Sequence, residues 1–210
     1  MVDTVPDLAF CLDRALIALG AAPVGEQKVR GWVGDGLSSL INQALEWSCD
    51  ETLDDALVQT ARTLFLELYA THTSERSQIY EGVATGLDYL REAGAQLACV
   101  TNKGGLYTEK LLAELGLKNR FAMIVSGDTL DTRKPDPGPL LHVARELGAE
   151  PRECLLVGDS HTDVEAARAA RFAIICVSYG YNRGLDIRFS RPDAVIDSLA
   201  ELETLFDKVG

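Results

Sequence analysis

Apolar residues recur at helical spacing over the first third of the chain. They predict one amphipathic helix that begins near Pro6 and ends at Gly20, because its apolar positions lie three or four residues apart. The same spacing predicts a second helix from Leu37 to Trp47 and a longer third one from Leu53 to about Thr73. We therefore expect residues 5–78 to form a small helical bundle without strands.

The pattern changes near Gln78, where short apolar runs begin to alternate with amphipathic segments. The expected strands are residues 97–100, 122–125, 154–157, 173–177 and 194–196, and the expected helices are 85–92, 106–115, 138–147, 162–170 and a last one that ends near Phe206. Buried strands separated by helices are typical of a parallel, doubly wound sheet. The sequence thus predicts a Rossmann-like α/β core that follows a helical unit.

Composition and charge limit the possible partners. The 210 residues are 47% hydrophobic, as in a globular protein with one core and a smaller second unit. The net charge of −12 argues against nucleic acid or an anionic membrane as the main partner, since both select for clustered Lys and Arg. We find no signal peptide pattern and no apolar run of bilayer length, so we expect a cytoplasmic protein, either a monomer or a homodimer.

Cysteine and histidine positions do not suggest a metal centre. The five cysteines lie far apart among apolar neighbours, without a C-x-x-C spacing, and are expected to be buried thiols in a reducing compartment. The three histidines share no ligand spacing and are expected to lie at the surface or in satisfied hydrogen bonds.

Asp159 follows the expected strand that ends at Val157. Gly158 suits a tight turn between this strand and a helix that starts near Thr162. Ligands of open α/β sheets bind at this carboxyl edge, where a carboxylate is a natural ligand for Mg²⁺. Asp163, four residues later, is a second candidate. Either residue alone could also be a plain helix cap or a first-turn acid.

Two more polar motifs follow neighbouring expected strands. The run Thr101-Asn102-Lys103-Gly104-Gly105 offers a hydroxyl and successive N–H groups at a helix start, which favours a phosphate cradle, although Thr101 could simply cap its helix. Lys134, in a loop with prolines, can neutralise phosphate and carboxylate charge or be an ordinary solvated lysine. Because parallel strands end at one edge, we expect the three motifs to converge on one phosphate and metal site.

Together these motifs resemble the second to fourth motifs of the haloacid dehalogenase superfamily of phosphatases. Within it, the chain is similar over nearly its full length to the phosphoglycolate phosphatases, notably in Val2–Leu8, Trp32–Gly36, Ala44–Trp47 and Tyr179–Asn182. The resemblance implies an α/β fold with a Rossmann-like parallel sheet core and a small all-helical cap domain. It implies that residues 1–4 are a remnant of the core N-terminus, residues 5–78 the cap and residues 79–210 the core.

The resemblance also implies a reaction, which is Mg²⁺-dependent hydrolysis of a small phosphorylated metabolite, 2-phosphoglycolate, through an aspartyl-phosphate. The implied catalytic residues are Thr101, which holds the phosphoryl group, Lys134, which offsets the charge between nucleophile and phosphate, and Asp159, which ligates Mg²⁺. Asp163 would lie behind the metal and position Lys134 or the metal waters. The implied substrate-binding residues are Asn102 and Lys103 in the core and Gly34 and Gly36 in a loop of the mobile cap.

One family motif is not in this sequence. The Asp-x-Asp-Gly-Thr-Leu run, which carries the nucleophile and lies on a central strand, would directly precede Val2. We therefore expect two unpaired parallel strand edges in the core, an inactive 210-residue chain, and an in-frame run encoding the motif upstream of Met1. The alternatives are a noncatalytic module that binds phosphate or Mg²⁺, and a phosphatase for another small phosphate ester.

Overall fold

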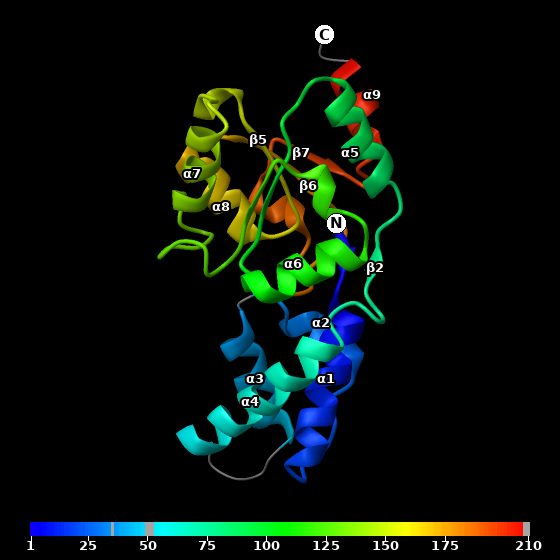
Figure 1. The fold of residues 1–210 in the computed structure, drawn as a ribbon, viewed down its shortest axis with the longest axis vertical. Helices are drawn as coiled ribbons and strands as arrows, with labels where there is room; N and C mark the ends of the chain where they lie inside the picture. The colour runs from blue at the N-terminus through cyan, green and yellow to red at the C-terminus, as the bar shows by residue number, and fades with distance from the viewer. Residues whose placement is uncertain (35, 49–52, 208–210) are drawn as a thin grey trace. The chain divides into compact units, whose positions relative to one another are not determined.

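The computed structural model describes residues 1–34, 36–48 and 53–207 of the chain, which divides into two compact units. Val2–Gln78 form one, which we call the helical unit, and Met1 together with the chain from Ile79 onward forms the other, the core unit. Figure 1 colours the helical unit from blue to cyan and most of the core unit from green to red.

Four helices make up most of the helical unit, and they are α1 (Val5–Ala18), α2 (Glu26–Trp32), α3 (Leu37–Ser48) and α4 (Asp55–Thr71) (Figure 1). Pro6 lies in the first turn of α1, and Gly20 follows the helix with a φ of 77°, as the sequence predicts. Helix α2 has no counterpart in the prediction, because Val29 is its one buried residue and leaves no apolar period to detect.

The two ends of the helical unit meet in a short pair of strands. Strand β1 (Val2–Asp3) pairs with β2 (Gln78–Ile79). The expectation that no strand occurs up to residue 78 is wrong at this point, since a two-residue strand is too short to show an alternating pattern.

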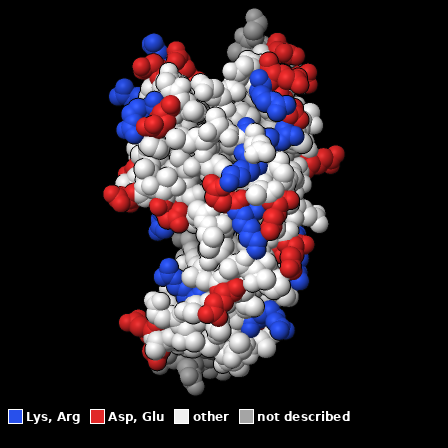
Figure 2. Space-filling view, viewed as in Figure 1, with Lys and Arg blue, Asp and Glu red and all other residues white. Residues whose placement is uncertain are grey.

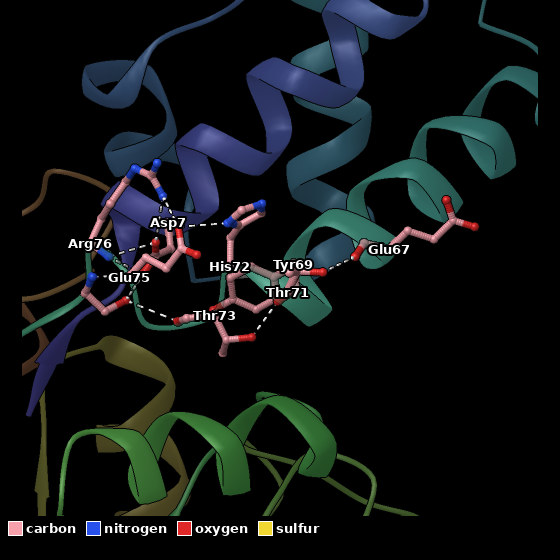
Figure 3. A network of polar contacts seen from close by, with 9 residues as sticks. Asp7, Glu67, Tyr69, Thr71, His72, Thr73, Glu75 and Arg76 are labelled. Atoms are coloured by element: carbon pink, nitrogen blue, oxygen red, sulfur yellow. Dashed lines mark hydrogen bonds and ion pairs between the residues drawn. The ribbon is translucent and has the colours of Figure 1, made fainter.

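A buried carboxylate fastens the same two ends. Asp7, in the first turn of α1, has no exposed surface. Its oxygens accept the N–H of Arg76 at 3.0 and 3.1 Å, the N–H of Ser77 at 2.8 Å and the Ser77 hydroxyl at 2.6 Å. The guanidinium of Arg76 lies 3.6 Å away, and Figure 3 shows it facing Asp7 with Glu75 and His72 beside it. Asp7 therefore ties α1 to a segment about 70 residues later in the chain.

The core unit alternates strands and helices as predicted. Its strands are β3 (Ala98–Val100), β4 (Met123–Val125), β5 (Leu155–Gly158), β6 (Ala173–Val177) and β7 (Ala194–Ile196). Its helices are α5 (Val83–Glu92), α6 (Gly105–Glu114), α7 (Gly138–Glu146), α8 (His161–Ala170) and α9 (Glu201–Asp207). Small residues, Ala166, Ala167 and Ala170, let α8 pack closely against β5 and β6, where Ile174 and Cys176 are fully buried.

All ladders of the core are parallel, which confirms that part of the prediction. Strand β3 pairs with β4, with Ala98 opposite Met123, and β5 pairs with β6, which pairs with β7. In the described part of the chain no ladder joins β3 to β5, so the strands form two separate sheets where the pattern predicts one. Strands β3 and β5 therefore each have one edge without a partner strand among the described residues, as expected.

Charged side chains are mixed over the face drawn in Figure 2, where acidic and basic groups alternate and no continuous basic patch forms. Four cysteines are described as free thiols, of which Cys11, Cys99 and Cys176 are buried and Cys154 is partly buried. Cys49 lies outside the described residues. None of the helices in the described ranges has the length and apolar character needed to cross a bilayer.

Candidate active site

The turn between β5 and α8 is built around Asp163. Ser160 is the N-cap of α8, and its hydroxyl and the Asp163 carboxylate exchange hydrogen bonds with each other's N–H groups at 3.3 and 3.1 Å. Gly158 lies in β5 and not in a tight turn, which corrects the prediction for this residue. A Cβ at Gly158 would lie 2.5 Å from the Cβ of Asp163, so glycine is needed there to make room for the aspartate.

Lys134 joins this turn to the end of β3. Its Nζ donates to Asp163 Oδ1 at 2.7 Å and to the carbonyl oxygen of Val100 at 2.8 Å. The two side chains are nearly buried, with 11% of Lys134 and 6% of Asp163 exposed. An ammonium group has three N–H donors. One donor of Lys134 therefore has no partner among the described residues and remains available to a ligand.

The second oxygen of Asp163 is fully engaged. It accepts the N–H groups of Asp159 and Ser160, each at 3.1 Å, and the Ser160 hydroxyl at 2.7 Å. Burial alone would raise the pKa of Asp163, but the Lys134 ammonium and these donors outweigh burial and lower it. Asp163 is thus a charged carboxylate that orients Lys134, and both of its oxygens are already in hydrogen bonds.

Asp159 has a different environment. Its Oδ2 accepts the N–H of Tyr181 at 3.2 Å, while its Oδ1 accepts no hydrogen bond from the described residues. Burial, followed by the negative charge of Asp163, raises the pKa of Asp159 to about 6. The N-terminal ammonium of Met1 and the Lys134 ammonium offset this rise only in part, and a cation bound at Oδ1 would stabilise the charged carboxylate further.

The loop after β3 brings Thr101 and Asn102 to the same edge. Thr101 N–H continues the ladder by donating to Val125 O at 2.9 Å, and its hydroxyl accepts the N–H of Lys103 at 3.2 Å. The Asn102 side chain donates to the main-chain carbonyl of Lys134 at 2.8 Å. The N–H of Asn102 has no partner within the described residues, so this N–H and the Thr101 hydroxyl can donate to an oxyanion.

The predicted phosphate cradle at the start of α6 is partly filled. Asp128, which follows β4, accepts the N–H of Gly105 at 2.8 Å. The same loop packs tightly on β3's loop, since Gly127 N–H donates to Lys103 O at 2.9 Å and a Cβ on Gly127 would lie 2.2 Å from Asn102 O. Sequence reasoning missed Asp128, because its partner lies 23 residues away and no local pattern marks the contact.

The remaining predicted residues lie elsewhere or are only partly described. Gly34 and Gly36 lie between α2 and α3 in the helical unit, with φ angles of 140° and 88°. Asp35 between them lies outside the described residues. Lys103 contributes its N–H and carbonyl groups to the loop after β3. A substrate contact for Lys103, Gly34 or Gly36 stays a prediction.

The fit to a metal ion rests on Asp159. Among the described residues, no group of three or more His, Cys, Asp or Glu side chains could hold a metal. Mg²⁺ is usually bound through one or two carboxylates, with waters and substrate phosphates in the other positions. Oδ1 of Asp159 fits as one such ligand, whereas Asp163 is committed to Lys134. Two histidines have other partners, since His72 lies 2.8 Å from Glu75 and His142 lies 2.9 Å from Arg145.

The chemistry of this edge is that of an oxyanion and cation site. It combines the Lys134 ammonium with its spare donor, the Thr101 hydroxyl, the Asn102 N–H and the Asp159 carboxylate with one unpaired oxygen. Thr101 and Asn102 follow β3, Asp159 follows β5, and Lys134 reaches both from the loop after β4. An anion bound there would meet local positive charge in a chain whose net charge is −12.

Comparison with known proteins identifies relatives over almost the whole chain. A phosphoglycolate phosphatase of Nitrosococcus oceani is 50% identical over 208 residues, which cover 99% of this chain and 92% of the relative. One from Pseudomonas putida strain KT2440 is 42% identical over 203 residues, or 96% of this chain and 74% of the relative.

A solved structure gives the same answer for the fold. The crystal structure of a predicted phosphoglycolate phosphatase from Haemophilus somnus 129PT superposes with a TM-score of 0.93 at 30% identity, over 98% of this chain and 93% of that one. The family model for the haloacid dehalogenase-like hydrolases matches residues 1–177. These matches confirm the predicted α/β fold and superfamily, and the chain belongs to the haloacid dehalogenase-like hydrolase family.

Proposed function

We propose that this protein is a Mg²⁺-dependent phosphatase that hydrolyses 2-phosphoglycolate. The observation that carries the proposal is the position of Lys134, whose ammonium is held between Val100 O and Asp163 with one donor to spare. The names of the relatives from Nitrosococcus oceani and Pseudomonas putida support the substrate. We propose the cytoplasm as its place of action.

Three residues of the core unit would bind the phosphoryl group, each through a different donor. The spare N–H of Lys134, the hydroxyl of Thr101 and the N–H of Asn102 would each donate to a phosphoryl oxygen. Asp163 keeps the ammonium aimed at the substrate, and the Asn102 side chain fixes the main chain of Lys134. In this arrangement charge is placed before the substrate arrives, so little reorganisation is needed during the reaction.

Among the described residues, Asp159 is the one that would bind the metal ion. Haloacid dehalogenase-like phosphatases generally depend on a metal ion, and a single carboxylate oxygen without a hydrogen bond favours Mg²⁺, which usually takes its other ligands from waters and substrate phosphates. The ion would offset the charge of the phosphoryl oxygens. We also propose that residues 5–78 act as a mobile cap over a core of residues 79–210, with Gly34 and Gly36 in the loop that meets the substrate.

The test is phosphate release from 2-phosphoglycolate by the full-length gene product, with Mg²⁺ and with chelator. We expect Mg²⁺-dependent release that is lost in Asp159→Asn. A matched control is Asp131→Asn, an exposed aspartate of the core unit with no partner among the described residues, which should keep full activity.

Each other outcome has a clear meaning. Faster hydrolysis of hexose phosphates than of 2-phosphoglycolate would contradict the substrate but not the reaction. Saturable binding of inorganic phosphate without any turnover would contradict the phosphatase and support a noncatalytic binding module. Full activity of Asp159→Asn would remove Asp159 from the metal site.

A further inference from the structure

The segment Tyr179–Asn182, which follows β6, lies directly against the turn that carries Asp159. Tyr181 N–H donates to Asp159 Oδ2 at 3.2 Å, and Asn182 Oδ1 accepts the N–H of His161 at 3.0 Å. These bonds join the segment to the residues on either side of Ser160. One oxygen of Asp159 is therefore held by a part of the chain that lies 22 residues away.

This close approach depends on Gly180. The residue has a φ of +113°, a conformation that side chains disfavour, and a Cβ there would lie 2.2 Å from Asp159 Oδ2 and 2.6 Å from Asp159 Cβ. Any side chain at position 180 would therefore displace the Asp159 carboxylate. The backbone of the segment is thus fitted to Asp159 itself.

Asn182 holds the segment in this position. Besides accepting from His161, its side-chain amide donates to Leu185 O at 3.0 Å, and its own carbonyl accepts the N–H of Leu185 at 2.9 Å. His161 N–H belongs to the first turn of α8, where helix donors have no partner within the helix. The Asn182 amide therefore fastens the segment to the start of α8.

Hydrophobic packing anchors the chain before and after the segment. Tyr179 packs its ring on Tyr80, with ring centroids 4.4 Å apart, and so anchors the beginning of the segment. Residues 183–186, which follow Asn182, are all exposed. The next residue, Ile187, is buried in the core, so the polar contacts of Asn182 hold the chain between Tyr179 and this exposed stretch.

We propose that Asn182 is a positioning residue for Asp159. By fastening the segment to α8, it keeps Tyr181 N–H on Oδ2 and leaves Oδ1 as the oxygen that faces a metal ion. Partners that orient a metal ligand from behind typically change metal affinity or activity by about 10- to 100-fold when they are removed. The inference rests on the proposed function in one respect, which is that Asp159 is a Mg²⁺ ligand.

The test is a calorimetric titration of the full-length protein with Mg²⁺ alone. We expect Asn182→Ala to weaken Mg²⁺ binding by about 10-fold or more. Asn182→Asp keeps an acceptor for His161 N–H and should bind Mg²⁺ within about threefold of the unchanged protein, because a carboxylate also suits a helix N-terminus. Asn119→Ala, at an exposed asparagine without a partner among the described residues, should change nothing.

A second readout separates positioning from a general loss of structure. Amide hydrogen exchange at Tyr181 and His161 should become faster in Asn182→Ala, while exchange in β6 stays unchanged. Equal Mg²⁺ affinity of Asn182→Ala and the unchanged protein would overturn the inference, as would a loss in Asn182→Asp as large as that in Asn182→Ala.

The failures of the two proposals can be told apart. If the unchanged protein binds Mg²⁺ and Asn182→Ala binds it more weakly, but 2-phosphoglycolate is not hydrolysed, only the proposed substrate fails. If hydrolysis is Mg²⁺-dependent and Asn182→Ala retains the full affinity, only the inference on Asn182 fails. No saturable Mg²⁺ binding by the unchanged protein would overturn the inference together with the metal role of Asp159.

Discussion

Asp7 in the helical unit and Asp163 in the core unit occupy the same kind of position. Each is a buried carboxylate in the first turn of a helix, and each accepts hydrogen bonds on both oxygens. They differ in their donors. Asp7 is bound by main-chain N–H groups and a hydroxyl, with the Arg76 guanidinium more distant at 3.6 Å, whereas Asp163 receives an ammonium directly at 2.7 Å.

The difference shows what each arrangement can do. The neutral donors of Asp7 belong to the chain itself, so the carboxylate fixes two chain segments and nothing is left over for a ligand. Asp163 gives one oxygen to its own turn and the other to Lys134, whose remaining donor points to no described residue. A buried carboxylate therefore stabilises the chain in the first case and aims a charged side chain in the second.

The largest effect on stability is expected from Asp7→Ala. The substitution leaves the Arg76 and Ser77 N–H groups and the Ser77 hydroxyl without an acceptor, which should cost about 3–5 kcal/mol of unfolding free energy. Both tryptophans lie in the helical unit, so tryptophan fluorescence during urea unfolding reports on it selectively.

A matched control for this comparison is Asp55→Ala. Asp55 is also a first-turn acid, in α4, but it is exposed and has no partner among the described residues, so its loss should cost less than about 1 kcal/mol. Equal losses in the two variants would show that Asp7 acts only on the helix dipole.

Lys134→Met should have the next largest effect. It leaves the buried Asp163 charge without its counter-ion, which we expect to cost about 2–4 kcal/mol, and it removes the donor for inorganic phosphate. Unfolding is followed by hydrogen exchange in β5 and phosphate binding by calorimetry. Adding Asp163→Asn should recover part of the stability, because no uncompensated charge remains, but none of the phosphate binding. Recovery of both would contradict the role given to Lys134.

Arg76→Ala should cost only about 1 kcal/mol. The guanidinium is 39% exposed and 3.6 Å from Asp7, so its ion pair is weak, and its contact with the Phe10 ring at 3.7 Å adds a similar small term. The main-chain N–H of residue 76 still donates to Asp7. Urea unfolding followed by tryptophan fluorescence measures the cost, and a loss as large as that of Asp7→Ala would mean that the two carboxylates are held in the same way.

The smallest expected effect is on stability at high pH, and it comes from the thiols of Cys11 and Cys176, which lie near Asp7 and Asp163. Burial, followed by the charge of Asp7, raises the pKa of Cys11 to about 12, and burial, followed by the charges of Asp163 and Asp159, raises that of Cys176 to about 12. The folded state then binds more protons than the unfolded state above about pH 9, so these thiols leave stability unchanged below pH 9 and lower it as the pH rises toward 12.

Thiol labelling at pH 8 followed by peptide mapping checks this prediction. Cys11 and Cys176 should react only in unfolded protein, because the thiolate is the reactive form. Rapid labelling of Cys176 in the folded protein would contradict its burial beside Asp163, and rapid labelling of Cys11 would contradict that beside Asp7.

The sequence predicts the alternation of core strands and helices well, because buried strands and amphipathic helices leave strong periods. It places Thr101, Lys134 and Asp159 at one edge as well, since all parallel strands end at the same edge of a sheet. Helix α2 was missed because a single buried residue, Val29, carries no period.

Side-chain partners could not be predicted, because they depend on chain segments that are distant in sequence. Asp7 and Asp163 look alike as first-turn acids, and only the positions of Ser77 and Lys134 in space distinguish them. The same limit applies to Asn102, whose side chain turns to the main chain of Lys134. It applies to Gly158 as well, where the reason for glycine is an aspartate on the next helix.

The pairing of β1 with β2 has a consequence for how such proteins change over evolution. It brings the points where the chain enters and leaves the helical unit to within one strand spacing, about 4.8 Å. A module whose ends meet can be spliced into a surface loop of an unrelated host, which must supply only two adjacent chain ends. A gene segment for residues 2–78 can therefore be gained, exchanged or deleted as one block without altering the strand order of its host.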